Sequence, residues 1–229
     1  YYALIARAHM DRFGTTEEHF AHAAVSCRAW ANQHPKAQMR DLISVEDVLG
    51  SRPIADPLKV LDCSLVSDGG AAVVITRGDL ASSAAQKPIY LLGYGEGHAY
   101  EHISQAQDLT TSAAAISGRA AYADSGLTPD DIDLLQLYDC FTPALLIQIE
   151  DLGFCAKGEG GDWLASGISQ PGGQKPLNSH GGMLSYCHPG NPGAMFGLTE
   201  AMLQLRGQAG ERQLPSINTA LCHAQGGIM

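Results

Sequence analysis

The sequence lacks any apolar run of about 18 residues or more, the length that a membrane-spanning helix needs. It opens with YYALIARAHM, which lacks the charged start, apolar core and small-residue cleavage site of a signal peptide. The six cysteines are scattered and form no C-x-x-C pair. These absences predict a cytoplasmic protein with free thiols, no disulfide framework and no membrane span.

Basic residues are also scarce. The 229 residues include 14 Lys and Arg against 24 Asp and Glu, so the net charge is −10. A nucleic-acid surface needs clustered Lys and Arg, and this balance therefore argues against binding DNA or RNA. A few local donors could still hold a small anionic ligand. The apolar fraction of 45% is ample for a sizeable core in one or two domains.

The first part of the chain predicts helices. Residues 1–13 show helical apolar spacing, and Gly14 is placed to end that helix. Thr15 and Glu18 form a capping box for a second helix, EEHFAHAAVSCRAWAN. A short helix is expected at residues 45–49.

Strands and helices alternate in the rest of the chain. The β-branched run AAVVIT predicts a buried strand. Strands are expected at residues 71–76, 88–93, 133–137 and 217–221, and helices at 112–125, 142–153 and 194–206. This alternation predicts an α/β protein with a mostly parallel sheet covered by helices.

The small, polar stretch at residues 77–87 marks a predicted domain boundary, with one domain at 1–78 and another at 79–229. The first residue is not Met, and the chain opens inside a predicted helix. It closes on GGIM, which is typical of a strand that is about to begin. We therefore expect the sequence to be a piece of a longer protein.

Three short segments concentrate chemically active side chains. The loop GGMLSYCHPGNPG at 181–193 carries Tyr and His, and LYDCFT at 137–142 follows a predicted strand. Cys222 and His223 follow another strand. Ligands bind beyond the carboxyl ends of the strands in open α/β sheets, so we expect the three segments to share one pocket.

Four segments resemble the thiolase superfamily, most closely the sterol-carrier-type thiolases and their non-thiolase relatives. They are DCSLVSDGGAAVVIT, YDCFTPALLIQIEDLGFCAKGEGG, NSHGGMLSYCHPGNPGA and ALCHAQGG. The resemblance implies the layered αβαβα thiolase-like fold, here the end of the first domain and most of the second. It also implies a homodimer formed through the N-terminal domain. The family's nucleophilic cysteine would lie upstream of residue 1.

Two departures from that family stand out. Tyr138 replaces the histidine before Asp-Cys-Phe, and Tyr186 stands two residues before His188. This pair of tyrosines resembles the lipid-transfer-protein-type steroid side-chain aldolases, which cleave a β-hydroxyacyl-CoA without a cysteine nucleophile. The resemblance implies an OB-fold partner with a zinc ribbon, an acyl-CoA substrate and no cofactor other than the CoA of the substrate.

Retro-aldol cleavage needs two proton transfers and donors that hold an enolate. We expect Tyr138 and Tyr186 to share the proton transfers, and His188 with N–H groups of the glycine-rich loop to hold the enolate oxygen. Cys222 and His223 are further candidate catalytic residues. A tyrosine base needs a lowered pKa: about 2 units, or roughly 3 kcal/mol, which a charged His188 or His223 could supply.

The remaining residues of these segments are expected to line the substrate pocket. They are Asp139, Cys140, Gly181, Gly182 and Cys187. Asp139 could instead cap the helix that begins at Phe141. No metal site is expected.

The main prediction is an aldolase that releases a ketone and a short acyl-CoA from a β-hydroxyacyl-CoA, with a bulky, steroid-like acyl group. Two alternatives stay open: a sterol-carrier-type thiolase, or acetyl-CoA acyltransferase, that uses an upstream cysteine, and a non-catalytic thiolase-like subunit that binds acyl-CoA.

Overall fold

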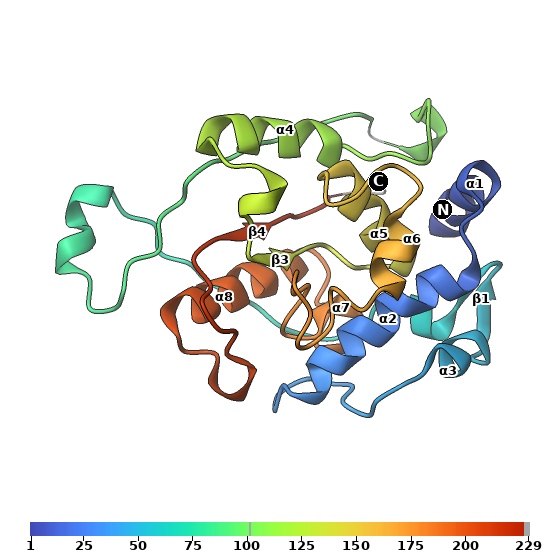
Figure 1. The fold of residues 1–229 in the computed structure, drawn as a ribbon, viewed down its shortest axis with the longest axis horizontal. Helices are drawn as coiled ribbons and strands as arrows, with labels where there is room; N and C mark the ends of the chain where they lie inside the picture. Colours follow the sequence, from blue (N-terminus) through green and yellow to red (C-terminus); the bar gives the residue numbers. More distant parts are fainter. Residues whose placement is uncertain (101, 227–229) are drawn as a thin grey trace.

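The computed structural model describes residues 1–100 and 102–226. Helices form most of its regular structure (Figure 1). The helices are α1 (Tyr2–Phe13), α2 (Glu17–Asn32), α3 (Val45–Leu49), α4 (Ala114–Ser125), α5 (Thr142–Asp151), α6 (Gly160–Ala165), α7 (Gly182–Ser185) and α8 (Gly193–Arg206). The strands are β1 (Pro53–Ala55), β2 (Leu58–Lys59), β3 (Leu134–Gln136) and β4 (Ala220–Cys222). Among the described helices, none is long and apolar enough to cross a membrane.

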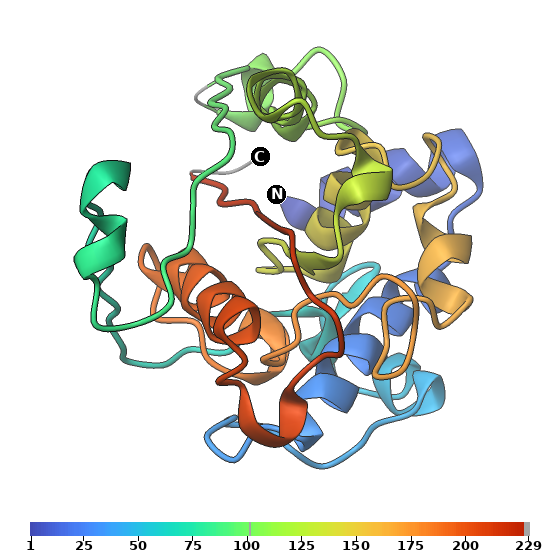
Figure 2. The same cartoon turned by 60° about the vertical axis from the view of Figure 1, so that its left-hand side comes forward.

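Strands β3 and β4 lie at the centre of the molecule and run parallel, with Leu134 opposite Ala220. All three residues of β3 are buried. Figures 1 and 2 show α4 and α8 on opposite sides of this strand pair. The predicted α/β class and the parallel pairing are therefore confirmed.

Helix α5 is the central helix of the core. Its sequence, TPALLIQIED, is apolar nearly all round, and its residues from Thr142 to Glu150 are buried. A helix of this kind is stable only when other elements cover every face. Helices α1, α2, α4 and α6 pack around it. The core also encloses two of its polar residues, Gln148 and Glu150.

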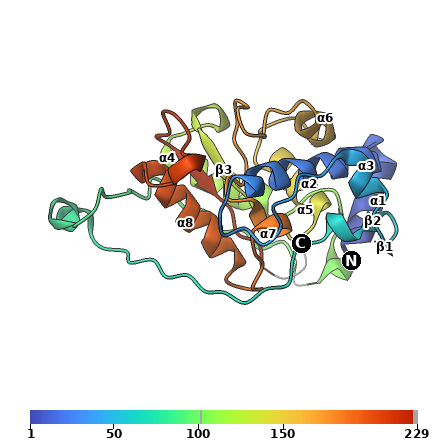
Figure 3. The same cartoon turned by 90° about the horizontal axis from the view of Figure 1, so that it is seen from below.

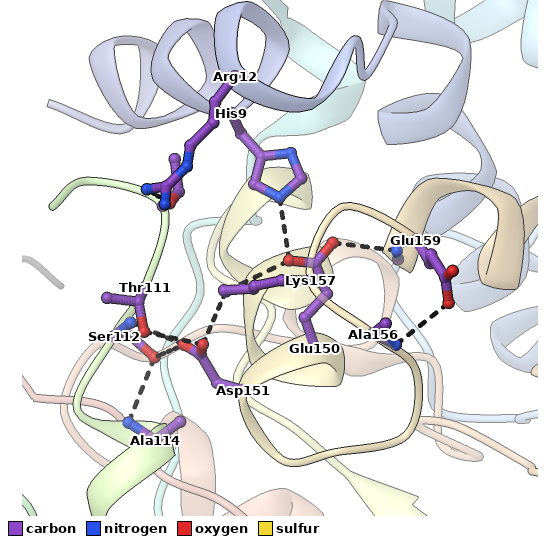
Figure 4. Close-up of polar contacts among 12 residues, drawn as sticks. His9, Arg12, Thr111, Ser112, Ala114, Glu150, Asp151, Ala156, Lys157 and Glu159 are labelled. Carbon is purple, nitrogen blue, oxygen red and sulfur yellow. Dashed lines mark hydrogen bonds and ion pairs between the residues drawn. The ribbon is translucent and has the colours of Figure 1, made fainter.

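The buried carboxylate of Glu150 belongs to an ion network between α1 and α5 (Figure 4). Its Oε2 lies 3.0 Å from Nε2 of His9 and 3.3 Å from Nζ of Lys157. Lys157 also lies 2.7 Å from Asp151 Oδ1. Burial alone would raise the pKa of Glu150, but the hydrogen bond from His9 and the charge of Lys157 hold it below its usual value.

The helix predictions at 1–13, 45–49, 112–125, 142–153 and 194–206 are confirmed with small shifts at the ends. Gly14 ends α1 in the left-handed region, at φ 74°. The helix predicted as EEHFAHAAVSCRAWAN matches α2, but its capping residue was predicted one position too early.

Thr16, rather than Thr15, caps α2. The Thr16 hydroxyl accepts from the N–H of His19, whose ring nitrogen accepts from the N–H of Thr16. Thr15 is buried instead, and its hydroxyl lies 2.8 Å from Nδ1 of His9. Because Thr15 contacts His9 on α1, Thr16 is the threonine that caps α2. The local sequence alone does not distinguish between the two.

The predicted strands at 71–76 and 88–93 are wrong for this structure. Both segments are extended, with no strand paired to them in the described part of the chain (Figure 3). Several of their apolar side chains are exposed, with Val74 at 87%, Ile75 at 85% and Leu91 at 79%. A strand needs backbone hydrogen bonds from a neighbour, and sequence preference alone does not supply one.

The boundary predicted between residues 78 and 79 stays a prediction. The segment around it holds one short 3-10 turn, Gly78–Ser83, which lies away from the body of the molecule (Figure 1).

Candidate active site

Tyr138 and His188 form a direct contact. The Tyr138 hydroxyl lies 3.2 Å from Nε2 of His188, and the two rings meet edge-on with centroids 5.9 Å apart. The other ring nitrogen of His188, Nδ1, lies 2.7 Å from the hydroxyl of Ser64. The backbone N–H of His188 donates to the hydroxyl of Ser67 at 2.7 Å. The imidazole is therefore held at both nitrogens.

Sequence reasoning missed both serines, because neither stands in a catalytic pattern. They belong to the segment DCSLVSDGG, whose backbone runs beside the active loop: the N–H of Ser67 donates to the carbonyl of His188. Only the pairing of these two distant segments in the folded chain identifies Ser64 and Ser67 as site residues.

The protonation states of the pair follow from burial. Burial, with smaller contributions from Cys140 and Asp139, raises the pKa of Tyr138 to about 12. Burial also lowers the pKa of His188, and that of His223 to about 4. A tyrosine hydroxyl therefore faces a neutral imidazole near pH 7. The prediction that a charged histidine lowers the tyrosine pKa is wrong for the free protein.

Gln148 of α5 connects Tyr138 to His223. Its Oε1 accepts from the backbone N–H of Tyr138 at 3.2 Å and lies 2.7 Å from Nδ1 of His223. Its Nε2 donates to the carbonyls of Tyr138 at 2.6 Å and Ala144 at 2.9 Å. Sequence reasoning treated this position as part of a helix and gave it no role.

Asp139 caps the short helix α7. Its carboxylate accepts from the N–H groups of Met183 at 2.8 Å and Leu184 at 3.2 Å. The helix that follows Phe141 has no side-chain cap, so the predicted capping of that helix by Asp139 is wrong. Burial raises the pKa of Asp139 to about 6, against the opposing effect of those two N–H donors.

The two glycines of the loop give the backbone its shape. Gly181 and Gly182 have φ values of 106° and 65°, which side chains rarely adopt. A Cβ on Gly182 would lie 1.9 Å from Oδ2 of Asp139. These glycines let the loop close over Asp139, and their expected contact with substrate stays a prediction.

Tyr186 lies in a separate aromatic cluster. Its ring centroid is 4.5 Å from His34, 5.3 Å from His180 and 5.8 Å from Phe196. Burial raises its pKa, so the hydroxyl stays protonated. The structure thus brings Tyr138 and His188 together, while Tyr186 contacts other rings. Its predicted catalytic role stays a prediction.

The candidate cysteines are thiols at neutral pH. Burial raises the pKa of Cys140 to about 12 and that of Cys187 to about 11. Neither thiol is therefore a thiolate at neutral pH, and the expectation that both line the substrate pocket stays a prediction. Cys222 is exposed at the end of β4, opposite Gln136 of β3.

A small cavity lies between β3 and the start of α8. It is lined by Gln136, Leu137, Asp139, His180, Met183, Gly193, Ala194, Gly197 and His223. Two of these residues carry a buried atom, Gln136 Oε1 and His180 Nδ1, that has no hydrogen-bond partner among the described residues. These two residues therefore have polar atoms left to hydrogen-bond a small polar group. Within residues 1–100 and 102–226, no cluster of His, Cys, Asp and Glu could hold a metal ion.

Comparisons with known proteins agree on one family. The family model described as thiolase C-terminal domain-like matches residues 95–229. An acetyl-CoA acetyltransferase of Methanothermobacter thermautotrophicus is 37% identical over 99% of this chain and 59% of its own length. The 17-hydroxy-3-oxo-4-pregnene-20-carboxyl-CoA lyase of Mycobacterium tuberculosis is 38% identical over 90% of this chain and 54% of its own.

A solved structure named Ltp2-ChsH2(DUF35) aldolase matches with a TM-score of 0.89 and 36% identity. The match covers 96% of this chain and 58% of that one. The chain thus spans a little over half the length of these three relatives.

Proposed function

The chain belongs to the thiolase superfamily, and from that premise we propose that it is the C-terminal part of an aldolase that cleaves a β-hydroxyacyl-CoA by retro-aldol chemistry. The contact between the Tyr138 hydroxyl and His188 Nε2, at 3.2 Å, is the observation that carries the proposal. The similarity to a named CoA lyase and a named aldolase supports it. The products are a ketone and a shorter acyl-CoA, and the acyl group is bulky and steroid-like.

The first step removes the proton of the β-hydroxyl. Tyr138 accepts that proton at its oxygen while its own proton passes to Nε2 of His188. The transfer avoids a free phenolate, which the Tyr138 pKa of about 12 disfavours. Ser64 Oγ, 2.7 Å from Nδ1 of His188, accepts the Nδ1 hydrogen and holds the ring in place.

The carbon–carbon bond then breaks, and its electron pair passes to the α-carbon to form the thioester enolate. The new imidazolium charge of His188 stabilises the enolate oxygen. The N–H groups of the glycine-rich loop contribute less to holding the enolate oxygen than the sequence suggested, because Asp139 already binds those of Met183 and Leu184. The first turn of α8, with Ala194 on the cavity lining, supplies the positive end of a helix instead.

A proton must finally return to the α-carbon. Tyr186 fits this step as a donor, because its raised pKa keeps its hydroxyl protonated. The proton that His188 gained in the first step then passes to the Tyr186 oxygen through solvent, so both residues regain their starting states. Substrate binding or a change of rotamer would have to bring that hydroxyl out of its cluster with His34 and Phe196. His223 and Cys222 remain candidates for contacts with the substrate.

The assembly is proposed on the same basis. We expect a cytoplasmic homodimer formed through the N-terminal domain, and an OB-fold partner with a zinc ribbon. The name of the similar Ltp2-ChsH2(DUF35) aldolase, which joins two proteins, supports a partner subunit. No cofactor is needed beyond the CoA of the substrate.

A second candidate is a thiolase-type acyltransferase. The acetyl-CoA acetyltransferase at 37% identity favours it. That reaction needs a cysteine thiolate, whereas burial raises the pKa of Cys140 and Cys187. A thiolase-type reaction would therefore need a nucleophilic cysteine other than Cys140 and Cys187. A non-catalytic acyl-CoA-binding subunit is the third candidate.

One assay separates the three candidates. The intact protein is incubated with a β-hydroxyacyl-CoA and, separately, with a β-ketoacyl-CoA plus free CoA. Ketone release without added CoA supports the aldolase, and cleavage that requires CoA supports the acyltransferase. Binding without either reaction supports the non-catalytic subunit.

A further inference from the structure

We propose that Gln148 is a positioning residue that fixes His223 in the tautomer with its hydrogen on Nδ1, so that Nε2 is a hydrogen-bond acceptor for the substrate hydroxyl. The proposal rests on the proposed function, which requires a hydroxylated acyl chain. The fixed tautomer of His223 also makes this site favour a β-hydroxyacyl over a β-ketoacyl group.

The orientation of the Gln148 amide is determined by its neighbours. Its NH2 group faces the carbonyls of Tyr138 and Ala144, at 2.6 and 2.9 Å. Reversing the amide would set its oxygen against two carbonyl oxygens, which cannot donate. The side chain is fully buried, so water cannot replace either contact. Oε1 must therefore face the N–H of Tyr138 and the ring of His223.

The tautomer of His223 follows from that orientation. An amide oxygen only accepts, so Nδ1 of His223, 2.7 Å away, must donate. Burial lowers the pKa of His223 to about 4, so the ring is neutral and carries one N–H. That hydrogen is on Nδ1, and Nε2 keeps a lone pair.

The cavity beside His223 offers a second acceptor. His223 and Gln136 both line it, and the two strands are joined there by the N–H of His223 donating to the carbonyl of Gln136 at 2.9 Å. The Gln136 side-chain NH2 donates to the hydroxyl of Ser179 at 3.1 Å, which turns Oε1 away from that bond. Ser179 in turn donates to Glu200, so the direction of this chain is set.

A site with two acceptors favours a ligand that donates. When the substrate binds, before its proton passes to Tyr138, a β-hydroxyl group offers its O–H to His223 Nε2 or Gln136 Oε1, whereas a β-keto oxygen only accepts and would meet lone pairs. An unmet hydrogen bond of this kind costs roughly 1–3 kcal/mol, or about 5- to 150-fold in affinity. The fixed tautomer therefore contributes specificity for the hydroxylated substrate.

The test uses the 15N spectrum of His223, recorded on the intact protein without substrate. The wild-type ring should show a protonated Nδ1 and an unprotonated Nε2. A protonated Nε2 in the wild type overturns the proposal, whether or not any variant folds. Because this readout needs no turnover, a correct tautomer in a protein without aldolase activity contradicts the proposed function and leaves the tautomer assignment standing.

The variant Gln148→Met tests the role of the glutamine itself. It keeps the length of the side chain and removes the acceptor, so hydrogen should shift from Nδ1 toward Nε2. The dissociation constant of a β-hydroxyacyl-CoA should rise by about tenfold, while that of the matching β-ketoacyl-CoA should not rise. An unchanged spectrum, or an equal loss for both ligands, overturns the positioning role.

Gln204→Met is the matched control. Gln204 is also a buried helical glutamine, and its amide donates to Glu200 and the carbonyl of Arg212 and accepts from the N–H of Leu214. This variant should lose stability and leave the His223 tautomer unchanged. A similar shift of the tautomer in Gln204→Met would show that general loosening, rather than Gln148, moves the proton.

Discussion

The hydroxyl of Tyr138 lies 3.2 Å from Nε2 of His188, although 50 residues separate them in the chain. Tyr138 lies two residues beyond the end of β3, and His188 belongs to the loop between α7 and α8. The hydroxyl of Ser64, from a third segment, lies 2.7 Å from the other ring nitrogen of His188, Nδ1. Three segments that are distant in sequence thus form one row of hydrogen-bonded side chains, on which the proposed reaction depends.

The variant Tyr186→Phe tests the second tyrosine. If Tyr186 returns the proton to the α-carbon, loss of its hydroxyl should lower the rate of product formation by at least about 100-fold. Its ring packing with His34, His180 and Phe196 should keep the fold intact. Acyl-CoA release is followed by chromatography, with thermal unfolding as the check on stability. An unchanged rate would remove Tyr186 from the mechanism.

Stability should fall in acid because of three histidines. Burial lowers the pKa of His34, His180 and His223 to about 4, below the usual value of about 6.5. Between these values the unfolded chain binds more protons, so the free energy of unfolding decreases as the pH falls. Each histidine contributes at most about 1.4 kcal/mol per pH unit. The pKa of Asp139 is raised to about 6, so its contribution to the free energy of unfolding increases as the pH falls. It offsets the contribution of about one histidine.

Urea unfolding between about pH 7 and pH 4.5 measures this slope. The variant His180→Gln should flatten it, because one buried titrating group is removed. His98→Gln, at an exposed residue, is the control. Stability that rises on acidification would contradict the assigned neutral states.

The network around Glu150 should be important for stability. Its carboxylate is fully buried beside His9 and Lys157, so Glu150→Gln leaves Lys157 without one partner and weakens the contact with His9 (Figure 4). Breaking a buried pair of this kind costs about 3–5 kcal/mol. Asp162→Asn, at an exposed carboxylate near His19, should change the free energy of unfolding by less than about 1 kcal/mol. Equal effects in denaturant unfolding would contradict the structural role given to Glu150.

The variant Gly182→Ala should be strongly destabilising. The added Cβ would lie 1.9 Å from the buried carboxylate of Asp139, at a φ of 65°. Gly126 has a similar φ of 71°, and a Cβ there meets nothing within 4 Å. We expect Gly126→Ala to cost about 1 kcal/mol from backbone strain and Gly182→Ala to cost more than about 3 kcal/mol. Similar losses of stability in the two variants would show that Asp139 does not exclude a side chain at residue 182.

Local rules predicted the helices well. Apolar spacing, caps and glycine ends placed α1, α3 and α8 within a residue or two, because these signals act within one or two turns. The strand at 133–137 was also predicted correctly, since its buried run lies between turn residues. Its partner β4 was predicted a few residues early.

Longer-range features could not be read in this way. The β-branched run at 71–76 was predicted as a strand, but pairing needs a neighbour that local sequence does not reveal. Likewise, the pKa of Tyr138 depends on burial, and the tautomer of His223 depends on Gln148, 75 residues away. The motifs identified Tyr138 and His188 as candidates, whereas Ser64 and Gln148 required the folded arrangement.

The rate of ketone release by Tyr138→Phe tests the central claim most directly. With a β-hydroxyacyl-CoA as substrate, loss of the hydroxyl should lower kcat by at least about 100-fold, because the proton path to His188 is broken. Tyr122→Phe is the control, since its hydroxyl only donates to the carbonyl of Leu152 at 3.0 Å and should leave kcat within about twofold. A Tyr138→Phe protein that folds normally and releases ketone at the wild-type rate would contradict the account.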